Sequence, residues 1–314
     1  MPGIDLHTHL APDLTGAELP GVHAEREAVS FDGRRVGPPD LYRPDRLDAY
    51  LDTVGLDEAI VSVPPPFYRQ QLAAAESAAW VAAVNEGLLR RVEQHPRLTP
   101  LAYLPLEHPQ VAAAEYERIA GDARWAGVVG SAGGGSVSLA EPALRQLWQR
   151  LDEDGRLVQL HPGHATDPRL EPYYLANLLG NPMETAVAAA QLVFGEVLSE
   201  YPRIRFMLLH CGGCLPGVVG RWERGHATQR PGVPSLTLPP AEAVRRFYVD
   251  ALAHDPALVD LAVTVFGAER LVLGSDWPFP MGTEDPFALV AHLGPEYVTE
   301  VASTNAAAAL GRDA

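Results

Sequence analysis

The sequence predicts an α/β fold, a (β/α)₈ TIM barrel in which eight parallel strands alternate with helices. Eight short apolar runs recur along the 314 residues, and helical stretches lie between most of them. This alternation is typical of a parallel sheet that is covered by helices. No Gly-x-Gly-x-x-Gly motif follows the first apolar run, which disfavours the alternative of an open doubly wound sheet. A long connection after the first strand is expected to form a loop insertion in the barrel.

Each predicted strand is a nearly continuous apolar run, as expected for strands that are buried on both faces. The predicted strands cover residues 4–7, 59–63, 99–104, 127–130, 157–161, 204–210, 247–251 and 271–275. Helices are expected over residues 69–94, 109–122, 140–154, 183–200, 256–266 and 285–293, with a helical tail over residues 295–310. Asn181-Pro182 gives the fourth of these helices a favourable start, because Pro fits the first turn of a helix.

Two connections are longer than usual. Residues 10–42 join the first strand to the next helix and are rich in Pro, Gly and charged residues. Residues 221–240 carry several Arg residues and then a Pro-rich stretch. Loops of this length in a compact domain often act as lids or binding loops. Neither resembles a linker between domains, so the length and the 47% hydrophobic content fit a single barrel domain over residues 1–314.

The charged residues exclude several classes of protein. All 24 basic residues are Arg, against 40 acidic residues, so the formal net charge is −16. Such a surface repels nucleic acid and anionic membranes. Because the chain contains no Lys, it can form neither a Schiff base nor a P-loop of the usual form. It also lacks the carboxylated Lys that often bridges two metal ions, which favours a site for one ion.

The location is expected to be cytoplasmic. No apolar stretch is long enough for a transmembrane helix, and the N-terminal residues do not have the pattern of a signal peptide. The candidate metal ligands described next begin at residue 7, so removal of a leader would destroy the site. The expected partner is a small-molecule carboxylate, with no nucleic acid and no membrane.

Side chains that bind metals lie at the C-terminal ends of four predicted strands. His7 and His9 end the first strand, and His161, His210 and Asp276 each end or follow a later one. In a parallel barrel these ends open onto one face, where enzymes of this fold keep their chemistry. His7 and His9 share one side of their strand because side chains alternate along it. The set therefore predicts a site for one divalent ion, with Zn²⁺ or Mn²⁺ as the best fit.

The residues alone leave some roles open. His164 competes with His161 as a ligand, although the strand register favours His161. His210 could coordinate the metal or act beside it as a general acid or base, since imidazole titrates near neutral pH. Asp276 could ligate the ion, accept a proton from a bound water, or do both.

Cys211 and Cys214 are the only cysteines and follow His210 directly. A CxxC pair can be a redox site or half of a zinc knuckle, but no second CxxC completes a knuckle here. The favoured interpretation is two reduced, partly buried thiols in a tight turn. A thiol close to the pocket, or an added soft metal ligand, is the alternative.

Four motifs carry a resemblance to a known family. They are Ile4-Asp5-Leu6-His7-Thr8-His9, His161-Pro162, His210-Cys211-Gly212-Gly213 and Gly274-Ser275-Asp276-Trp277-Pro278-Phe279-Pro280. Together they resemble the amidohydrolase-related metal-dependent decarboxylases, and the resemblance spans nearly the whole chain. It implies an amidohydrolase-like barrel with one Zn²⁺ bound by His7, His9, His161 and Asp276. It also implies that His210 acts as an acid or base rather than as a permanent ligand.

The same resemblance implies a set of substrate-binding arginines and a homodimer. Arg221 matches a family Arg that reaches into the pocket of a neighbouring subunit and pairs with the substrate carboxylate. A dimer would then be the smallest complete unit, and higher homo-oligomers are also compatible. An Arg from the first long loop usually assists, and Arg34 and Arg35 are the candidates here.

The predicted function is therefore a metal-dependent carbon–carbon lyase that decarboxylates an aromatic or unsaturated carboxylic acid, with His210 and Asp276 as catalytic residues. A hydrolase or hydratase on the same scaffold is the alternative, because a fold does not fix a reaction. A protein that keeps the metal for structure alone is a third hypothesis. It fits poorly, because structural zinc sites are normally closed cages that are often rich in Cys.

Overall fold

Eight parallel strands form the centre of the molecule in the computed structural model, which describes residues 3–134, 137–163 and 166–312. In the order of the sheet, the strands are β1 (Ile4–His9), β5 (Glu58–Ser62), β6 (Leu98–Tyr103), β7 (Gly127–Ser131), β8 (Leu157–His161), β9 (Arg205–Leu208), β10 (Tyr248–Asp250) and β11 (Leu271–Val272). The segment after β11 closes the barrel against β1. There the Leu6 amide donates to the Leu273 carbonyl at 3.0 Å, and the His9 amide donates to the Trp277 carbonyl at 2.8 Å. The predicted (β/α)₈ barrel is confirmed.

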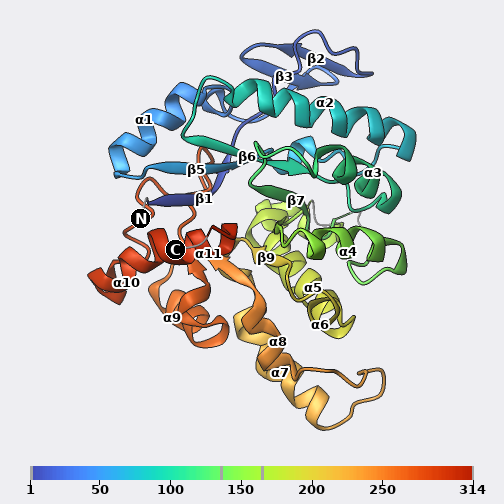
Figure 1. Ribbon diagram of the computed structural model, residues 1–314, viewed down its shortest axis with the longest axis vertical. Coiled ribbons are helices and arrows are strands. Elements are labelled where there is room, and N and C mark those ends of the chain that lie inside the picture. The colour runs from blue at the N-terminus through green and yellow to red at the C-terminus, as the bar shows by residue number, and fades with distance from the viewer. Residues whose placement is uncertain (1–2, 135–136, 164–165, 313–314) are drawn as a thin grey trace.

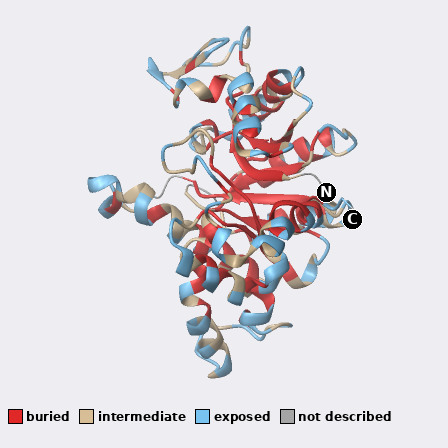
Figure 2. Cartoon of the chain, turned by 90° about the vertical axis from the view of Figure 1, so that its left-hand side faces the viewer, coloured by how far each residue is buried: buried red, intermediate tan, exposed pale blue. Residues whose placement is uncertain are grey.

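Helices cover the outside of this sheet (Figure 1). They are α1 (Pro44–Val54), α2 (Ala74–Val92), α3 (Pro109–Ile119), α4 (Arg145–Glu153), α5 (Asn181–Phe194), α6 (Val197–Glu200), α7 (Leu215–Ala227), α8 (Pro240–Ala243), α9 (Pro256–Phe266), α10 (Pro295–Thr299) and α11 (Asn305–Leu310). Figure 2 shows the strands buried at the centre, with the exposed residues on the outer helices and loops. Within the described residues, no helix is long and apolar enough to cross a membrane.

The first long connection contains a small sheet of its own. Strands β2 (Val22–Glu25), β3 (Ala28–Phe31) and β4 (Arg34–Arg35) pair antiparallel within residues 10–42 and lie beside α2 (Figure 1). The sheet is tied to the rest of the chain by Tyr42, whose hydroxyl donates to the Val36 carbonyl at 2.6 Å. It brings Phe31 towards the mouth of the barrel.

The second long connection was predicted wrongly. Residues 221–240 were expected to form a loop, but α7 extends from Leu215 to Ala227 and contains Arg221. Three glycines between residues 217 and 225 lower the helix propensity of this stretch, so its sequence does not predict a helix. Pro216 in the first turn and the apolar side chains of Leu215 and Val219, which are buried, hold the helix in place.

The reverse error occurs at residues 285–293. A helix was expected there, but the chain forms turns, followed by a short 3₁₀ helix at Ala291–Leu293. The Asp285 carboxylate accepts hydrogen bonds from the amides of Phe287 and Ala288 at 3.0 and 3.2 Å, the pattern of a helix N-cap, but the residues that follow form turns.

Other predicted helices have shifted ends. The one expected over 69–94 begins only at Ala74, since Arg69 has a φ of 43° that no helix accepts. The one expected over 183–200 breaks after Phe194, where Gly195 leaves room for Ala140. A Cβ on Gly195 would lie 2.2 Å from the Ala140 Cβ, so the two segments pack too closely for a side chain there.

Candidate metal centre

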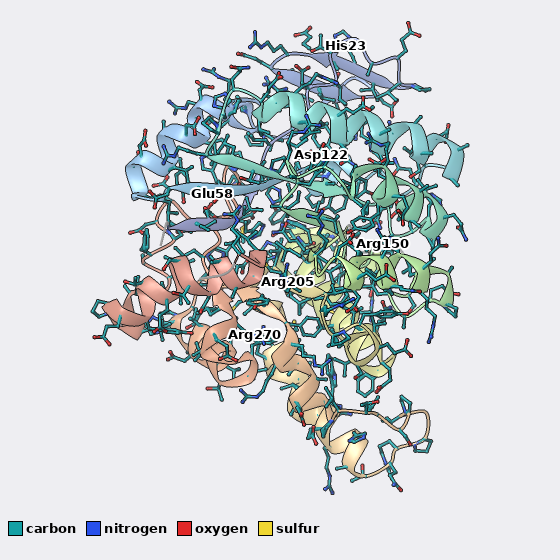
Figure 3. The ribbon with its side chains drawn as sticks, viewed as in Figure 1. His23, Glu58, Asp122, Arg150, Arg205 and Arg270 are labelled. Carbon is teal, nitrogen blue, oxygen red and sulfur yellow. The ribbon has the colours of Figure 1, made fainter. Side chains whose placement is uncertain are left out.

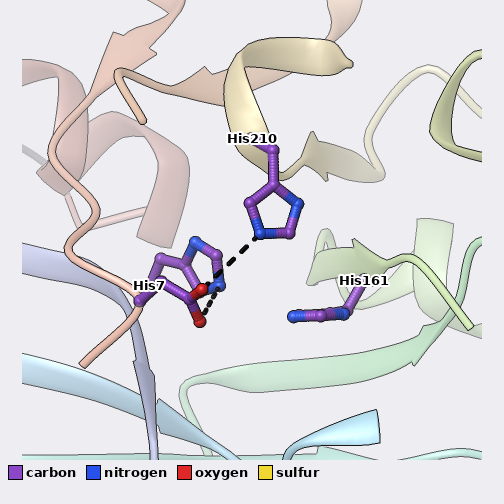
Figure 4. A group of neighbouring side chains, drawn as sticks. His7, His161 and His210 are labelled. Carbon is purple, nitrogen blue, oxygen red and sulfur yellow. Dashed lines mark ion pairs between the residues drawn. The ribbon is translucent and has the colours of Figure 1, made fainter. Parts of the chain in front are cut away.

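Five polar side chains converge at the C-terminal mouth of the barrel. Single ligand atoms of His7, His161, His210 and Asp276 lie within 4.8 Å of one another (Figure 4). His9 belongs to the same cluster, because its Nε2 lies 3.1 Å from Asp276 Oδ1. Its ring centroid lies 5.1 Å from that of His7 and 5.0 Å from that of His161. The fold therefore brings together the five side chains that the strand ends predicted as candidate metal ligands.

Three of the imidazoles are fixed by a hydrogen-bond acceptor behind the ring. In each case Nδ1 faces an oxygen, so that Nδ1–H donates and the Nε2 lone pair remains available for a cation. The Nδ1···O distances are 2.8 Å from His7 to Asp250 Oδ2, 3.3 Å from His9 to the Ser62 carbonyl, and 3.0 Å from His161 to the Pro162 carbonyl. This arrangement is characteristic of imidazoles that bind a metal.

His210 differs from these three. Its Nδ1 is buried and has no hydrogen-bond partner among the described residues, while its Nε2 lies 3.8 Å from Asp276 Oδ2. It stands just past β9, which ends at Leu208 rather than at residue 210 as predicted. Its φ is 54°, a left-handed conformation that is strained for a side-chain-bearing residue. The ring therefore reaches the cluster from a tight turn.

Asp250 holds this turn together, although it was not among the predicted site residues. Its carboxylate accepts hydrogen bonds from the amides of His210 and Cys211 at 3.1 and 2.8 Å, as well as facing His7 Nδ1. The signal was present, since Asp250 is a lone carboxylate within the apolar run predicted as the seventh strand. The Asp250 carboxylate faces Nδ1 of His7 rather than the cation site, so it is not itself a candidate ligand.

Asp5 and Gly274 fix the positions of the ligands on β1 and after β11. The Asp5 carboxylate accepts from the amides of His7 and Ser275, both at 3.1 Å, and burial raises its pKa to about 6. A Cβ on Gly274 would lie 2.8 Å from both the His7 and the Asp250 Cβ atoms. The backbone can therefore pass this close to the two side chains only at a glycine.

Buried polar atoms without partners test whether the cluster fits a metal. His7 Nε2, His9 Nε2 and Asp276 Oδ1 are buried and form no hydrogen bond within the described residues, although the carboxylate oxygen lies 3.4 and 3.1 Å from the two nitrogens. Burying such atoms unpaired is costly, and a cation among them would satisfy all three at once. The donor set, imidazole nitrogens with a carboxylate, suits a divalent transition metal. The residues present therefore fit one divalent ion.

The charges of the cluster depend on burial and on one another. Burial alone would raise the pKa of Asp276, but the neighbouring His7, His210 and His9 side chains hold it well below the usual range, with His7 protonated as long as no cation is bound. A bound metal would displace that proton from His7. For His161, burial and then the neighbouring imidazoles lower the pKa well below its usual value. Asp276 is thus ionised and His161 neutral, which are the forms that bind a cation.

A cavity of about 1250 Å³ opens onto this cluster. His161, His210 and Asp276 line its floor, and apolar side chains, including Phe31 and Phe279, line much of the rest. The bulk of an aromatic acid fits such a cavity, which has polar groups at one end and apolar walls.

The three arginines predicted to bind substrate do not line the cavity of this chain. Arg34 and Arg35 lie on β4, where both are exposed, and neither lines the cavity. Arg221 is exposed on α7, which extends away from the barrel (Figure 1), and it does not line the cavity of its own chain. The cavity is instead lined by Arg69, which was not among the predicted site residues. Its only signal was its place after the Pro64-Pro65-Pro66 run that follows the second barrel strand.

The remaining predictions concern the residues beside the ligands. His164 lies outside the described residues. Cys211 is buried and Cys214 half-buried, and both are free thiols in the turn after His210, as the favoured interpretation expected. Burial raises the pKa of both thiols, which disfavours the thiolate that a soft ligand or a redox nucleophile requires.

A buried imidazole–carboxylate cluster at the mouth of a (β/α)₈ barrel defines the class of metal-dependent barrel enzymes. Within that class, residues 4–312 match the amidohydrolase family, and the chain belongs to it.

Similar proteins span most of the chain. A 2-amino-3-carboxymuconate-6-semialdehyde decarboxylase of Dictyostelium discoideum is 27% identical over 99% of this chain and 90% of its own length. A gamma-resorcylate decarboxylase of a Rhizobium species is 25% identical over 73% of this chain and 75% of its own length. Among solved structures, the 5-carboxyvanillate decarboxylase of Sphingomonas paucimobilis superposes with a TM-score of 0.81 at 22% identity, covering 99% of both chains. This last likeness supports the fold.

Proposed function

We propose that the protein is a metal-dependent decarboxylase that removes CO₂ from an aromatic or unsaturated carboxylic acid. The observation that carries this proposal is the composition of the cavity floor. Anchored imidazoles and a carboxylate that suit a cation lie there beside His210, an imidazole that is not anchored. Two relatives that match 99% and 73% of the chain are named as decarboxylases of a carboxymuconate semialdehyde and of gamma-resorcylate, which supports the same reaction.

The cation would be held by His7, His9, His161 and Asp276. This choice is supported by the acceptors behind the three imidazoles, which orient the rings, and by the ionised state of Asp276. When bound, the cation would supply positive charge that orients substrate oxygens and stabilises negative charge as it develops. Zn²⁺ is the proposed ion. Mn²⁺ is the alternative, because a dihydroxybenzoic acid decarboxylase of a Polaromonas species with the same fold was solved with manganese bound.

His210 would transfer the proton. Decarboxylation breaks the bond between the ring or vinyl carbon and the carboxyl carbon, and it requires a proton to replace CO₂ on that carbon. Because Nδ1 of His210 is not engaged by another residue, the ring is free to exchange a proton and to adjust its position in the cavity. The Nε2 of His210 lies 3.8 Å from Asp276 Oδ2, so the ring stands directly beside the proposed cation site.

Arg69 would bind an acidic group of the substrate in place of Arg34 and Arg35. Its guanidinium lies over two aromatic rings, 5.1 Å from the centroid of Phe31 and 5.0 Å from that of Trp80, which holds it in place. No carboxylate of the described residues forms an ion pair with it. A preformed cation in a mostly apolar cavity is well suited to a carboxylate.

We expect Arg69→Gln to raise KM for the carboxylate substrate by about tenfold or more, because a charge-assisted hydrogen bond to a partly buried anion is lost. Steady-state kinetics, with kcat and KM measured separately, checks this expectation. Arg34→Gln is the matched control and should leave both constants unchanged. An increase in KM for Arg34→Gln, with none for Arg69→Gln, would restore the original assignment.

A homodimer in which Arg221 completes the partner's cavity is the proposed assembly. Large apolar side chains are exposed near the cavity mouth and on α5, including Tyr173 at 86%, Tyr174 at 60% and Val187 at 48% exposure. Contiguous exposed apolar side chains mark interaction surfaces. When equal amounts of the Arg221→Gln and His210→Asn proteins are mixed and allowed to exchange subunits, about a quarter of full activity should be restored. Half of the dimers are then mixed, and each mixed dimer contains one intact site out of two. No restored activity would mean that Arg221 does not act in the partner's cavity.

The experiment that tests the function is CO₂ release by the metal-loaded protein. Substituted benzoates, such as 2,6-dihydroxybenzoate and 5-carboxyvanillate, and unsaturated dicarboxylic acids form a suitable panel. Chelation should abolish the release, and readdition of Zn²⁺ or Mn²⁺ should restore it. Incorporation of solvent oxygen into product without CO₂ would instead identify a hydrolase or hydratase.

A further inference from the structure

A second cavity, of about 240 Å³, lies at the opposite end of the barrel from the metal centre. Arg205 is the first residue of β9, Tyr248 is the first residue of β10, and Arg270 directly precedes β11; all three line this cavity. Because Asp250 and Asp276 lie at or beyond the other ends of the same strands, the two cavities are separated by the length of the barrel. Arg205 and Arg270 are labelled in Figure 3.

Three half-buried arginines, Arg205, Arg246 and Arg270, line this small space without matching acids. Among the described residues, no carboxylate lies within 4.0 Å of the guanidinium of Arg205 or Arg246. Arg270 Nε is 3.9 Å from Glu269 Oε1, too far for a hydrogen bond, and this buried nitrogen has no partner in the described part of the chain. Such an uncompensated cluster stands out in a chain with a net charge of −16.

A fourth cation adds to the same region. Burial lowers the pKa of Arg205, and the nearby Arg156 guanidinium lowers it further against an opposing effect of Tyr248. Arg156 itself donates to the carbonyls of Ala120 and Trp125, and it forms no ion pair with an acid in the described part of the chain. Like charges gathered in a partly buried pocket repel one another, and a bound anion would relieve this repulsion.

The guanidinium groups are already held in position by the protein. Arg205 Nε donates to the Ala309 carbonyl of α11 at 3.0 Å, and Arg246 Nη1 donates to the Leu198 carbonyl. Arg270 stacks over the Tyr248 ring, with its Cζ 4.7 Å from the centroid. These contacts use one N–H group or one face of each side chain, and they leave further N–H groups of each guanidinium without an acceptor among the described residues. Donors fixed in this way lose little entropy when they bind a ligand.

A purely structural role explains only part of this arrangement. The bond from Arg205 to Ala309 anchors α11 under the barrel, and any long donor could make it. It does not account for three arginines around one cavity, nor for the unpartnered Nε of Arg270. Packing alone would place apolar or acid-paired side chains there, since unpaired buried donors cost stability.

We propose that this cavity is a binding site for a tetrahedral oxyanion, either inorganic phosphate or the phosphoryl group of a small molecule. Forked guanidinium groups match the oxygens of such an anion and bind it with charge-assisted hydrogen bonds. A volume of 240 Å³ holds a phosphate with room for a small substituent. The site is separate from the metal centre and does not depend on the decarboxylase assignment.

The test is a calorimetric titration of the metal-loaded full chain with inorganic phosphate. In a second measurement, thermal unfolding in phosphate is compared with thermal unfolding in chloride at equal ionic strength. Phosphate should bind at the arginine cavity and raise the melting temperature in a saturable manner beyond the effect of chloride. Arg246→Gln and Arg270→Gln should each weaken the binding by about tenfold or more. A parallel titration with glycerol 3-phosphate distinguishes inorganic phosphate from the phosphoryl group of a small molecule. The ligand with the lower Kd identifies the kind of anion that the cavity prefers.

Two controls locate the binding. Arg245→Gln removes an exposed neighbouring cation and should leave phosphate affinity unchanged. If Arg69→Gln abolishes phosphate binding while Arg246→Gln and Arg270→Gln retain full affinity, the anion binds at the metal-centre cavity and the proposal is wrong.

A measurement on the unmodified protein avoids the possibility that a variant loses phosphate binding because it misfolds. Crystals of the unmodified protein soaked in tungstate, an oxyanion with a strong anomalous signal, should show a peak among Arg205, Arg246 and Arg270. The absence of any peak there, at a concentration that saturates the solution titration, would overturn the assignment.

Discussion

Replacing His210 with asparagine is expected to lower kcat by about 10²- to 10⁴-fold, the usual contribution of a positioned general acid. Metal content should remain at one ion per chain, because the anchored imidazoles of His7, His9 and His161 and the Asp276 carboxylate are all retained. Asparagine also suits the left-handed φ of 54° at this position, so the turn should survive the change. Steady-state kinetics together with elemental analysis of the purified variant checks both expectations.

The same experiment separates the two roles left open for His210. The ligand atoms of His210 lie as close to those of His7, His161 and Asp276 as a metal ligand requires. Loss of the metal together with activity would make His210 a ligand and would displace His9 from the set. His254→Asn is a matched control, because His254 lines the same cavity and also has a left-handed φ, of 56°. It should retain near-normal kcat.

Replacing Asp276 with asparagine is expected to abolish both metal binding and activity. Asp276 is the single carboxylate of the cluster, and it carries the negative charge that balances a divalent cation among neutral imidazoles. Asparagine keeps the shape of the side chain and its φ preference, so the change tests charge rather than packing. Metal titration followed by calorimetry, and CO₂ release at saturating metal, are the measurements.

A graded comparison strengthens this test. Asp250→Asn keeps every proposed ligand but weakens the acceptor behind His7, so metal affinity should fall by about 10- to 100-fold and activity should return at high metal concentration. Stoichiometric metal in the Asp276→Asn variant would show that the cation, if any, is held elsewhere. Circular dichroism of both variants confirms that the barrel is intact.

The strand ends made the site predictable. His7 and His9 follow from the period of two along β1, and the C-terminal ends of parallel strands meet on one face. Predictions failed where local pattern and tertiary packing disagree. The glycines of α7 weaken its local signal although Leu215 and Val219 are buried, and residues 286–290 form turns although their apolar pattern predicts a helix. Arg34 and Arg35 could not be placed, because an antiparallel sheet inside the long connection turns β4 towards solvent.

By itself the sequence determined the alternation of strands and helices, the absence of Lys chemistry, and the identity of the side chains at the barrel mouth. These properties depend on composition and on short periods along the chain. Only the tertiary structure decided which of those side chains are anchored. The contact of His7 with Asp250 joins residues 243 positions apart. The packing of Arg69 over the rings of Phe31 and Trp80 joins three separate segments. Such contacts form when the barrel closes, because closure brings distant segments within hydrogen-bonding distance, and no local pattern records that distance.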